Sequence, residues 1–300
     1  MKEQGKAYYH LPGLFEALTF YREFLPLYRR HREYFYPWCE IGSIYGAPAD
    51  CLWGGGRVGF GEDSPEEVLS LLKEYDISGR LTFSNSLLRR EHLEDRKCNR
   101  LCRLFASSSL QNGVIVHSDV LLEYLMEKYP SLYLVSSTTK VLTAFPSLKK
   151  ELERPEFSFV VPDFRLNKDF DDLQLLPQDL KDKVEFLVNE CCSFHCGERK
   201  MCYEEVSRMS LGESTGDHHC LSPESSRGYR FSSAMRNPGF ISLEDIQRIY
   251  VPMGFSNFKI EGRSLGSALL LEFILYYMTK PEYHIALREE LYLESTLDLF

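Results

Sequence analysis

The fold is decided by the stretch NGVIVHSDVLLEYLMEKYPSLYLVSST, residues 112–138. Its pattern predicts a strand, a helix and a second strand in succession. The runs GVIV and LYLV are short and apolar, which is typical of strands buried on both faces of a sheet. Between them, apolar residues recur at helical spacing until the pattern stops at Pro130. Parallel strands need such a crossover, so this stretch predicts a βαβ unit.

The same alternation covers most of the 300-residue chain. Helical patterns separate the apolar runs; Ser64 and Ser242 are predicted N-caps because an acidic residue follows each of them three positions later. The remaining strand candidates lie in residues 36–46, 79–85, 157–163, 183–190 and 257–263. These seven strands, with an eighth hidden in residues 221–241, predict an α/β fold of the (β/α)8 TIM-barrel type. An incomplete barrel or a doubly wound open sheet is the alternative.

Composition sets the class of protein. With 44% hydrophobic and 26% charged residues, the chain is expected to form a single globular barrel domain over residues 1–300. The net charge of −9 argues against broad nucleic-acid binding. No signal-peptide core is visible, and the apolar run 267–278 falls short of the roughly 20 residues that span a bilayer, so it predicts a core helix. We therefore expect a cytoplasmic protein without a membrane partner.

Polar side chains follow nearly every predicted strand. In a barrel, the carboxyl ends of the strands converge on one mouth, where active sites are built, although loops are polar by default. The predicted acid–base groups are Asp163, Glu190 and Glu261. The predicted substrate-binding residues are Arg57, Asn85, His117, Arg165, Lys259 and Arg263.

Two further stretches point to the same mouth. In NFKIEGR, residues 257–263, strand alternation directs Phe258 and Ile260 to the helices and Lys259 and Glu261 to the interior. In WGGGR, residues 53–57, the glycines predict a loop whose backbone closely approaches a ligand, with a simple turn as the plainer interpretation.

Five cysteines crowd the segment after the strand at 183–190; the first, Cys191, could substitute for Cys192, but adjacent cysteines rarely bind one metal with good geometry. Cys192, Cys196, Cys202 and Cys220 give the spacing C-x3-C-x5-C-x17-C, in a predicted metal-binding insertion over residues 190–237. Thiolates on an irregular loop can hold an iron–sulfur cluster or zinc. The absence of C-x2-C favours the cluster, whereas the neighbouring His218 and His219 keep zinc open. The alternative without metal is that the thiols are small core side chains, which suits the dispersed residues Cys39, Cys51, Cys98 and Cys102.

The stretch KVEFLVNECCSFHCGERKMCY, residues 183–203, followed by GFSNFKIEGRSL at 254–265, resembles the collagenase-like peptidase family, which includes anaerobic iron–sulfur hydroxylases. The resemblance covers the last 120 residues or so. It implies a TIM-type barrel and, in the hydroxylase branch, a [4Fe-4S] cluster on Cys192, Cys196, Cys202 and Cys220, although the spacing departs from the hydroxylase pattern at Cys202. A weaker likeness in architecture is to atypical radical S-adenosylmethionine enzymes such as queuine lyases.

The leading hypothesis is therefore an iron–sulfur enzyme acting on a small polar metabolite, a nucleobase or RNA, with an electron donor as a partner. An atypical radical lyase using S-adenosylmethionine is the first alternative, and a zinc-stabilised binding protein without catalytic activity is the second.

Overall fold

The computed structural model describes residues 5–55, 61–213, 220, 228–262 and 264–294. In this part of the chain, eight parallel strands alternate with helices around a nearly closed barrel. The strands are β1 (Ala7–Pro12), β2 (Cys39–Gly46), β3 (Gly79–Phe83), β4 (Gly113–Val116), β5 (Tyr133–Ser136), β6 (Phe157–Val160), β7 (Glu185–Leu187) and β8 (Asn257–Lys259).

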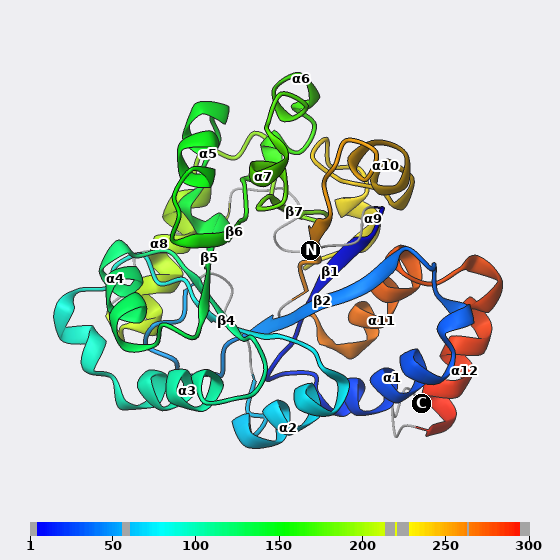
Figure 1. Ribbon diagram of the computed structural model, residues 1–300, viewed down its shortest axis with the longest axis horizontal. Coiled ribbons are helices and arrows are strands. Elements are labelled where there is room, and N and C mark those ends of the chain that lie inside the picture. The colour runs from blue at the N-terminus through cyan, green and yellow to red at the C-terminus, as the bar shows by residue number, and fades with distance from the viewer. Residues whose placement is uncertain (1–4, 56–60, 214–219, 221–227, 263, 295–300) are drawn as a thin grey trace.

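Helices surround the strands in Figure 1. The α-helices are α1 (Leu18–Arg30), α2 (Pro65–Tyr75), α3 (Arg96–Ala106), α4 (Asp119–Lys128), α5 (Phe145–Leu152), α6 (Phe170–Leu173), α7 (Gln178–Lys181), α8 (Arg199–Ser210), α9 (Phe231–Ala234), α10 (Leu243–Asp245), α11 (Gly266–Tyr277) and α12 (His284–Glu294). Short 3-10 turns are η1 (Arg32–Tyr34), η2 (Arg90–Glu94), η3 (Thr138–Lys140), η4 (Phe164–Leu166) and η7 (Pro281–Tyr283), and η6 (Ile246–Tyr250) is a π-helical turn.

The strand order around the barrel is β6-β5-β4-β3-β2-β1-β8-β7. The seam lies between β6 and β7, where a single bridge joins Val160 to Val184 within the described residues. There the Val160 amide donates to the carbonyl of Lys183 at 2.8 Å. The predicted barrel is thus confirmed, and the open-sheet alternative is wrong because the first and last members of the sheet meet at this seam.

The position predicted for the eighth strand is wrong. In residues 228–241, the described part of the interval 221–241, the structure has α9 and turns, whereas the missing strand is β1 at the N-terminus. β1 pairs with both β2 and β8 and so joins the strands β2–β6 to the pair β7–β8. Its sequence, AYYHLP, ends in proline and carries a buried histidine, His10, between Tyr9 and Leu11, so it lacks the uniformly apolar run of the predicted strands.

Local capping chemistry agrees with the sequence. The Ser64 hydroxyl accepts a hydrogen bond from the Glu67 amide at 3.4 Å at the start of α2. At α10, Ser242 and Asp245 form a reciprocal capping box with distances of 3.0 Å in both directions. The apolar run 267–278 becomes α11, and no helix of the described residues is long and apolar enough to cross a membrane.

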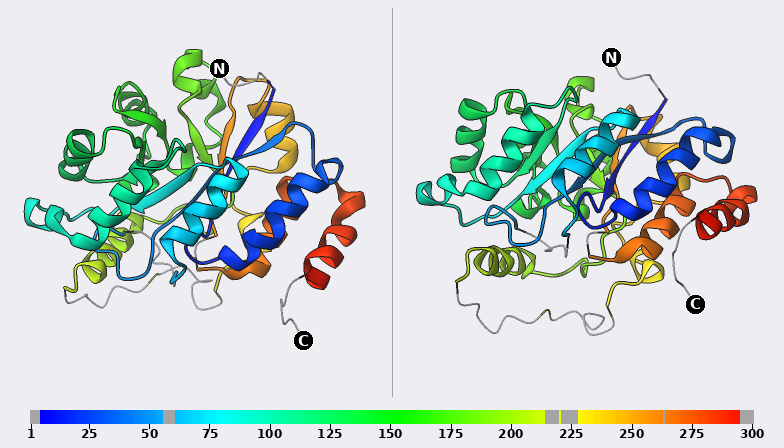
Figure 2. Two further views of the ribbon diagram at one scale, coloured as in Figure 1. Left: turned by 60° about the horizontal axis from the view of Figure 1, so that its bottom comes forward. Right: turned by 90° about the horizontal axis from the view of Figure 1, so that it is seen from below.

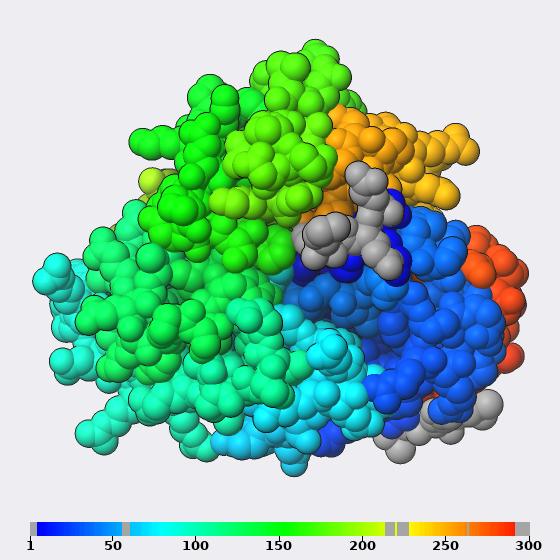
Figure 3. Space-filling model, viewed as in Figure 1, coloured from blue at the N-terminus to red at the C-terminus, as the bar shows by residue number. Residues whose placement is uncertain are grey.

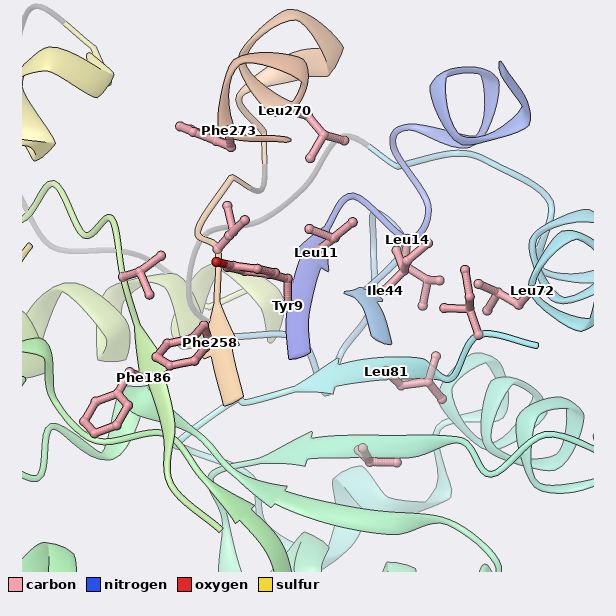
Figure 4. Close-up of a cluster of buried hydrophobic side chains, with 14 of the residues drawn as sticks. Tyr9, Leu11, Leu14, Ile44, Leu72, Leu81, Phe186, Phe258, Leu270 and Phe273 are labelled. Atoms are coloured by element: carbon pink, nitrogen blue, oxygen red, sulfur yellow. The ribbon is translucent and has the colours of Figure 1, made fainter. Parts of the chain in front are cut away.

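The core has two layers, inside and outside the strands. Outside, Tyr9, Leu11, Phe186 and Phe258 pack against helix residues such as Leu270 and Phe273 of α11 (Figure 4). Inside, a smaller apolar layer fills the middle of the barrel, formed by Tyr45, Ile115, Val135, Val161 and Leu187. The polar residues of the strands are therefore sorted into two groups, one at each end of the barrel.

Those two ends are distinct in Figure 2, where α8 and α9 lie on the end opposite the N-terminus. Because all strands run parallel, that end is the carboxyl-terminal mouth. It receives the segments that follow β6, β7 and β8, including the described part of the cysteine-rich segment.

Candidate functional site at the barrel mouth

A buried arginine organises the mouth. Arg199, the first residue of α8, is 3% exposed and lies between two carboxylates that follow β6 and β7. Its Nε is 3.3 Å from Oδ2 of Asp163, and its Nη2 donates to Oε2 of Glu190 at 2.6 Å. A guanidinium this deep is stable only when it is paired, so α8 is held on the barrel by these contacts.

Arg165 makes a second connection between the barrel and the cysteine-bearing loop. Its Nε and Nη2 donate to the two carboxylate oxygens of Asp163 at 2.6 and 3.0 Å, and its Nη1 donates to the carbonyl of Cys196 at 3.0 Å. The bidentate fork is a strong and directional contact. Arg165 and Asp163, both predicted from the sequence, therefore position the loop; their predicted roles toward a substrate stay predictions.

Glu190 fixes the beginning of the same loop. Its Oε1 accepts hydrogen bonds from the amides of Cys191 and Cys192, each at 2.9 Å. From the other side, the Asn237 side chain donates to the carbonyl of Cys192 at 2.8 Å. The loop leaves β7 in a conformation determined by charge-assisted hydrogen bonds, and so the first thiols are held at the mouth.

The predicted ligand thiols influence one another in pairs: Cys196 lies near Cys192 and near Cys202, and Cys220 lies near Cys202. Burial raises the pKa of Cys192 to about 12, with Glu190 and Cys196 also raising it and Arg199 lowering it. Burial, then the neighbouring Cys196 and Cys220, raise the pKa of Cys202. Cys192, Cys196 and Cys202 are partly exposed, and Cys220 is exposed. These thiols are therefore more accessible than the buried Cys39, Cys51, Cys98 and Cys102.

A second set of potential ligands lies beside these thiols. This set consists of Glu190, Cys191 and Glu261, each of which offers one ligand atom. The three atoms lie within 4.8 Å of one another, so this group could hold a metal ion. Glu261 is placed there by Asn189, whose side chain donates to the Glu261 carbonyl at 2.9 Å and accepts from the Glu261 amide at 2.7 Å. Cys191 was not among the predicted ligands, because adjacent cysteines rarely bind one metal with good geometry.

His117 lies on another part of the mouth, after β4. Its Nδ1 is 2.8 Å from the Thr139 hydroxyl, and burial, followed by the charges of Lys140 and Lys200, lowers the pKa of His117 to about 4. The imidazole is therefore neutral at pH 7. A neutral histidine can accept or donate a hydrogen bond to a ligand without adding charge.

Asn85 follows β3 and joins three segments. Its Nδ2 donates to the carbonyls of Leu52 and Ser207, each at 3.1 Å. A Cβ on Gly55 would lie 2.5 Å from the backbone of Ser84 and Asn85, so the predicted close approach exists, but to the end of β3. Approach of this glycine loop to a ligand stays a prediction.

The remaining predicted residues are divided. Lys259 faces the interior as expected, while Phe258 and Ile260 pack outward. The Nζ of Lys259 lies 3.6 Å from Oε1 of Glu185 and 3.6 Å from the Tyr45 ring centroid, in the interior below the mouth. Arg57, Arg263, His218 and His219 fall outside the described residues.

Arg199 is the buried, ion-paired residue of the mouth that sequence reasoning missed. The signal was a basic residue between Cys196 and Cys202, on a loop already expected to carry an anionic centre. What the sequence does not reveal is that this side chain is buried, because its two carboxylate partners follow different strands.

No protein-family model matches the chain, and no curated protein matches it. Among solved structures, the chain is similar to the U32 peptidase Mk0906, with a TM-score of 0.52 and 14% sequence identity. The likeness covers 87% of this chain and 95% of the other. At this identity the likeness extends to the fold, and it supports the resemblance to collagenase-like peptidases at that level: the chain shares its barrel with a U32 peptidase.

Proposed function

We propose that this protein is an iron–sulfur enzyme whose barrel mouth acts on a small polar metabolite or a nucleobase, free or within RNA. The observation that carries the proposal is the double attachment of the cysteine-bearing segment to the mouth through Arg165 and Arg199. A cluster on Cys192, Cys196, Cys202 and Cys220 would then lie beside Asp163, Glu190 and Glu261, where the strand ends converge.

The electrostatics suit an anionic group. Four thiolates carry more negative charge than the iron core neutralises in most cluster states, so nearby cations stabilise the bound form. Arg199 acts in this direction on Cys192, where it opposes the effect of burial on the pKa. When bound, the cluster would supply redox or Lewis-acid chemistry; the chain itself would orient the substrate with neutral His117 and exchange protons through Glu261. An external electron donor is part of the proposal.

A second candidate rests on the ligand set Glu190, Cys191 and Glu261. Mixed thiolate and carboxylate ligands suit zinc, and three protein ligands leave a fourth position open for water, as in catalytic zinc sites. In that case the protein is a mononuclear metal enzyme or a zinc-stabilised binding protein, and the four other thiols have no part in metal binding.

Metal analysis separates the candidates. We expect protein purified without oxygen to be brown and to contain about four iron and four sulfide per chain, the composition of a [4Fe-4S] cluster. Cys192→Ala and Cys196→Ala should each lose the iron, whereas Cys98→Ala, which removes a thiol buried on α3, should keep it. About one zinc and no iron per chain would favour the second candidate and reject the cluster.

The role of Glu261 can be tested separately. Glu261→Gln preserves shape and removes a charge, so we expect the fold and the absorption of the cluster to be unchanged. We expect turnover to fall at least tenfold, about 1.4 kcal/mol of barrier, because the proton-exchanging carboxylate is gone. Equal single-turnover rates for the variant and the wild type would show that Glu261 is only architectural.

A further inference from the structure

The amino-terminal end of the barrel contains a cavity that the proposed function does not use. Its volume is about 420 Å³, within the range of small-molecule sites. The lining includes Tyr8, His10, Arg80, Tyr133, Phe159 and Asn257, which lie near the starts of β1, β3, β5, β6 and β8. Figure 3 views the molecule from this end.

This cavity is separated from the mouth by the inner apolar layer. Along β5, Tyr133 lines the cavity, and Val135, two residues later, belongs to the apolar layer. Along β7, Glu185 lies at the amino end, Leu187 belongs to the apolar layer, and Asn189 binds Glu261 at the mouth. A ligand in the cavity would therefore not touch the cysteines or the carboxylates at the mouth.

The cavity is lined by the buried guanidinium of Arg80. Arg80 is 1% exposed, its Nε donates to the Tyr133 hydroxyl at 2.7 Å and its Nη1 donates to Glu185. Arg80 lines the cavity, and these two hydrogen bonds of Arg80 to described residues use Nε and Nη1 and not Nη2. A guanidinium nitrogen can donate a charge-assisted hydrogen bond to an oxygen of a carboxylate.

The charges around Arg80 favour an anion. The carboxylate of Glu185 is shared, since His10 Nε2 lies 3.5 Å from one oxygen and Lys259 Nζ lies 3.6 Å from the other, in addition to Arg80. One buried carboxylate thus faces two permanent cations, Arg80 and Lys259, and the imidazole of His10, which adds charge only when it is protonated. In a low-dielectric interior, an excess of cations over carboxylates attracts an anionic ligand strongly.

The walls are aromatic. The guanidinium of Arg80 lies 4.6 Å from the ring centroid of Phe159 and 5.3 Å from that of Tyr133. Aromatic rings around a cation suit a ligand with a flat or apolar body and a charged head. We propose that the amino-end cavity binds a small organic carboxylate, with its head group at Arg80 and its apolar body against Phe159, Tyr133 and Tyr8.

Benzoate is a suitable probe, with benzyl alcohol as a neutral molecule of similar shape and inorganic phosphate as an anion without an apolar body. We expect benzoate to bind the purified full chain saturably in ligand-observed NMR and to raise its melting temperature. Benzyl alcohol and phosphate should bind at least tenfold more weakly. Binding of phosphate but not of benzoate would overturn the carboxylate assignment, and binding of neither would overturn the site.

A variant that blocks the cavity tests whether benzoate binds there. Ser158 is exposed and lines the cavity, so Ser158→Trp fills the entrance without disturbing the buried charges. The matched control is Ser147→Trp, at an exposed position on α5 outside the cavity lining. We expect the first variant to lose benzoate binding at least tenfold and the control to keep it, with unchanged circular dichroism and metal content in both. Equal binding by the two variants would show that benzoate binds elsewhere and would overturn the proposal.

Discussion

Arg199 shows how much one side chain can decide. It contacts Asp163 after β6 and Glu190 after β7, and it lies beside Cys192 at the start of the cysteine segment. A loop of mostly polar residues has little apolar area with which to attach itself to a barrel. Its position therefore depends on a few charge-assisted hydrogen bonds, which give direction where packing would not.

Arg199→Gln should detach this segment. Removing one partner from a buried ion-pair network costs about 3–5 kcal/mol, because the carboxylates are left buried without their cation. We expect loss of bound metal together with faster proteolysis after residue 190. Arg208→Gln is the matched control, since Arg208 lies on the same helix with a side chain 41% exposed. Metal content equal to that of the control would contradict the anchoring role of Arg199.

The pKa of Glu185 predicts how the stability of the protein changes in acid. Burial alone would raise its pKa, but Arg80, His10 and Lys259 outweigh burial and lower it to about 2, from 4.5. A carboxyl group with a lowered folded-state pKa contributes stability that is present above pH 4.5 and is lost as the pH falls toward 2. Glu185→Gln should be less stable at pH 7 and should lose less stability than the wild type over that acid range.

The measurement is urea denaturation at several pH values. The difference in unfolding free energy between wild type and Glu185→Gln should shrink as the pH falls from 4.5 to 2. A difference in unfolding free energy that stays constant over this range would show that the pKa of Glu185 is the same in the folded and unfolded states.

At the scale of elements, strand alternation and helix caps explain most local structure. β8 presents Phe258 to the helix layer and Lys259 to the interior, as its alternation predicts. β1 escaped prediction because its inward residues, including His10, are polar and its last residue is Pro12. A short stretch with polar residues and a final proline can be assigned as a strand only when the strands that pair with it are known.

The two serine caps should differ in strength. Ser242→Ala breaks a reciprocal box with 3.0 Å bonds and should cost about 1 kcal/mol in the free energy of unfolding. Ser64→Ala breaks a longer, exposed bond of 3.4 Å and should cost less. Chemical denaturation of both variants checks the order; a larger cost for Ser64→Ala would show that the box at α10 is not the stronger cap.

On the scale of the whole molecule, the barrel and the cysteine segment are stabilised differently. The barrel has continuous strand pairing around the sheet and an apolar core on both sides of it. The segment after Glu190 is attached by the contacts of Arg165, Arg199 and Asn237 and by hydrogen bonds from Asn85 and Ser86 to Ser207 on α8. Metal ligation would add to those contacts without entering the core.

Chelation should therefore act on one part of the molecule. After metal removal from the purified protein, we expect far-ultraviolet circular dichroism to change little and limited proteolysis to cleave within residues 190–237 first. Metal binding there would be linked to the local order of the segment and not to the barrel. Cooperative loss of all secondary structure on chelation would contradict this division and would mean that the metal stabilises the barrel itself.

The sequence by itself determined the alternation of parallel strands and helices, seven of the strands, the serine caps and the concentration of thiols after β7, because periodicity and capping are local properties of the chain. Tertiary structure decided that the sheet closes into a barrel and does not stay open. It also decided what each polar residue contacts. Asp163 and Arg165 pair with each other and with the cysteine loop, Lys259 binds Glu185 inside the barrel, and Arg199 becomes central at the mouth. Charged side chains are placed by partners far away in sequence, and which partners meet depends on how the strands close into a barrel.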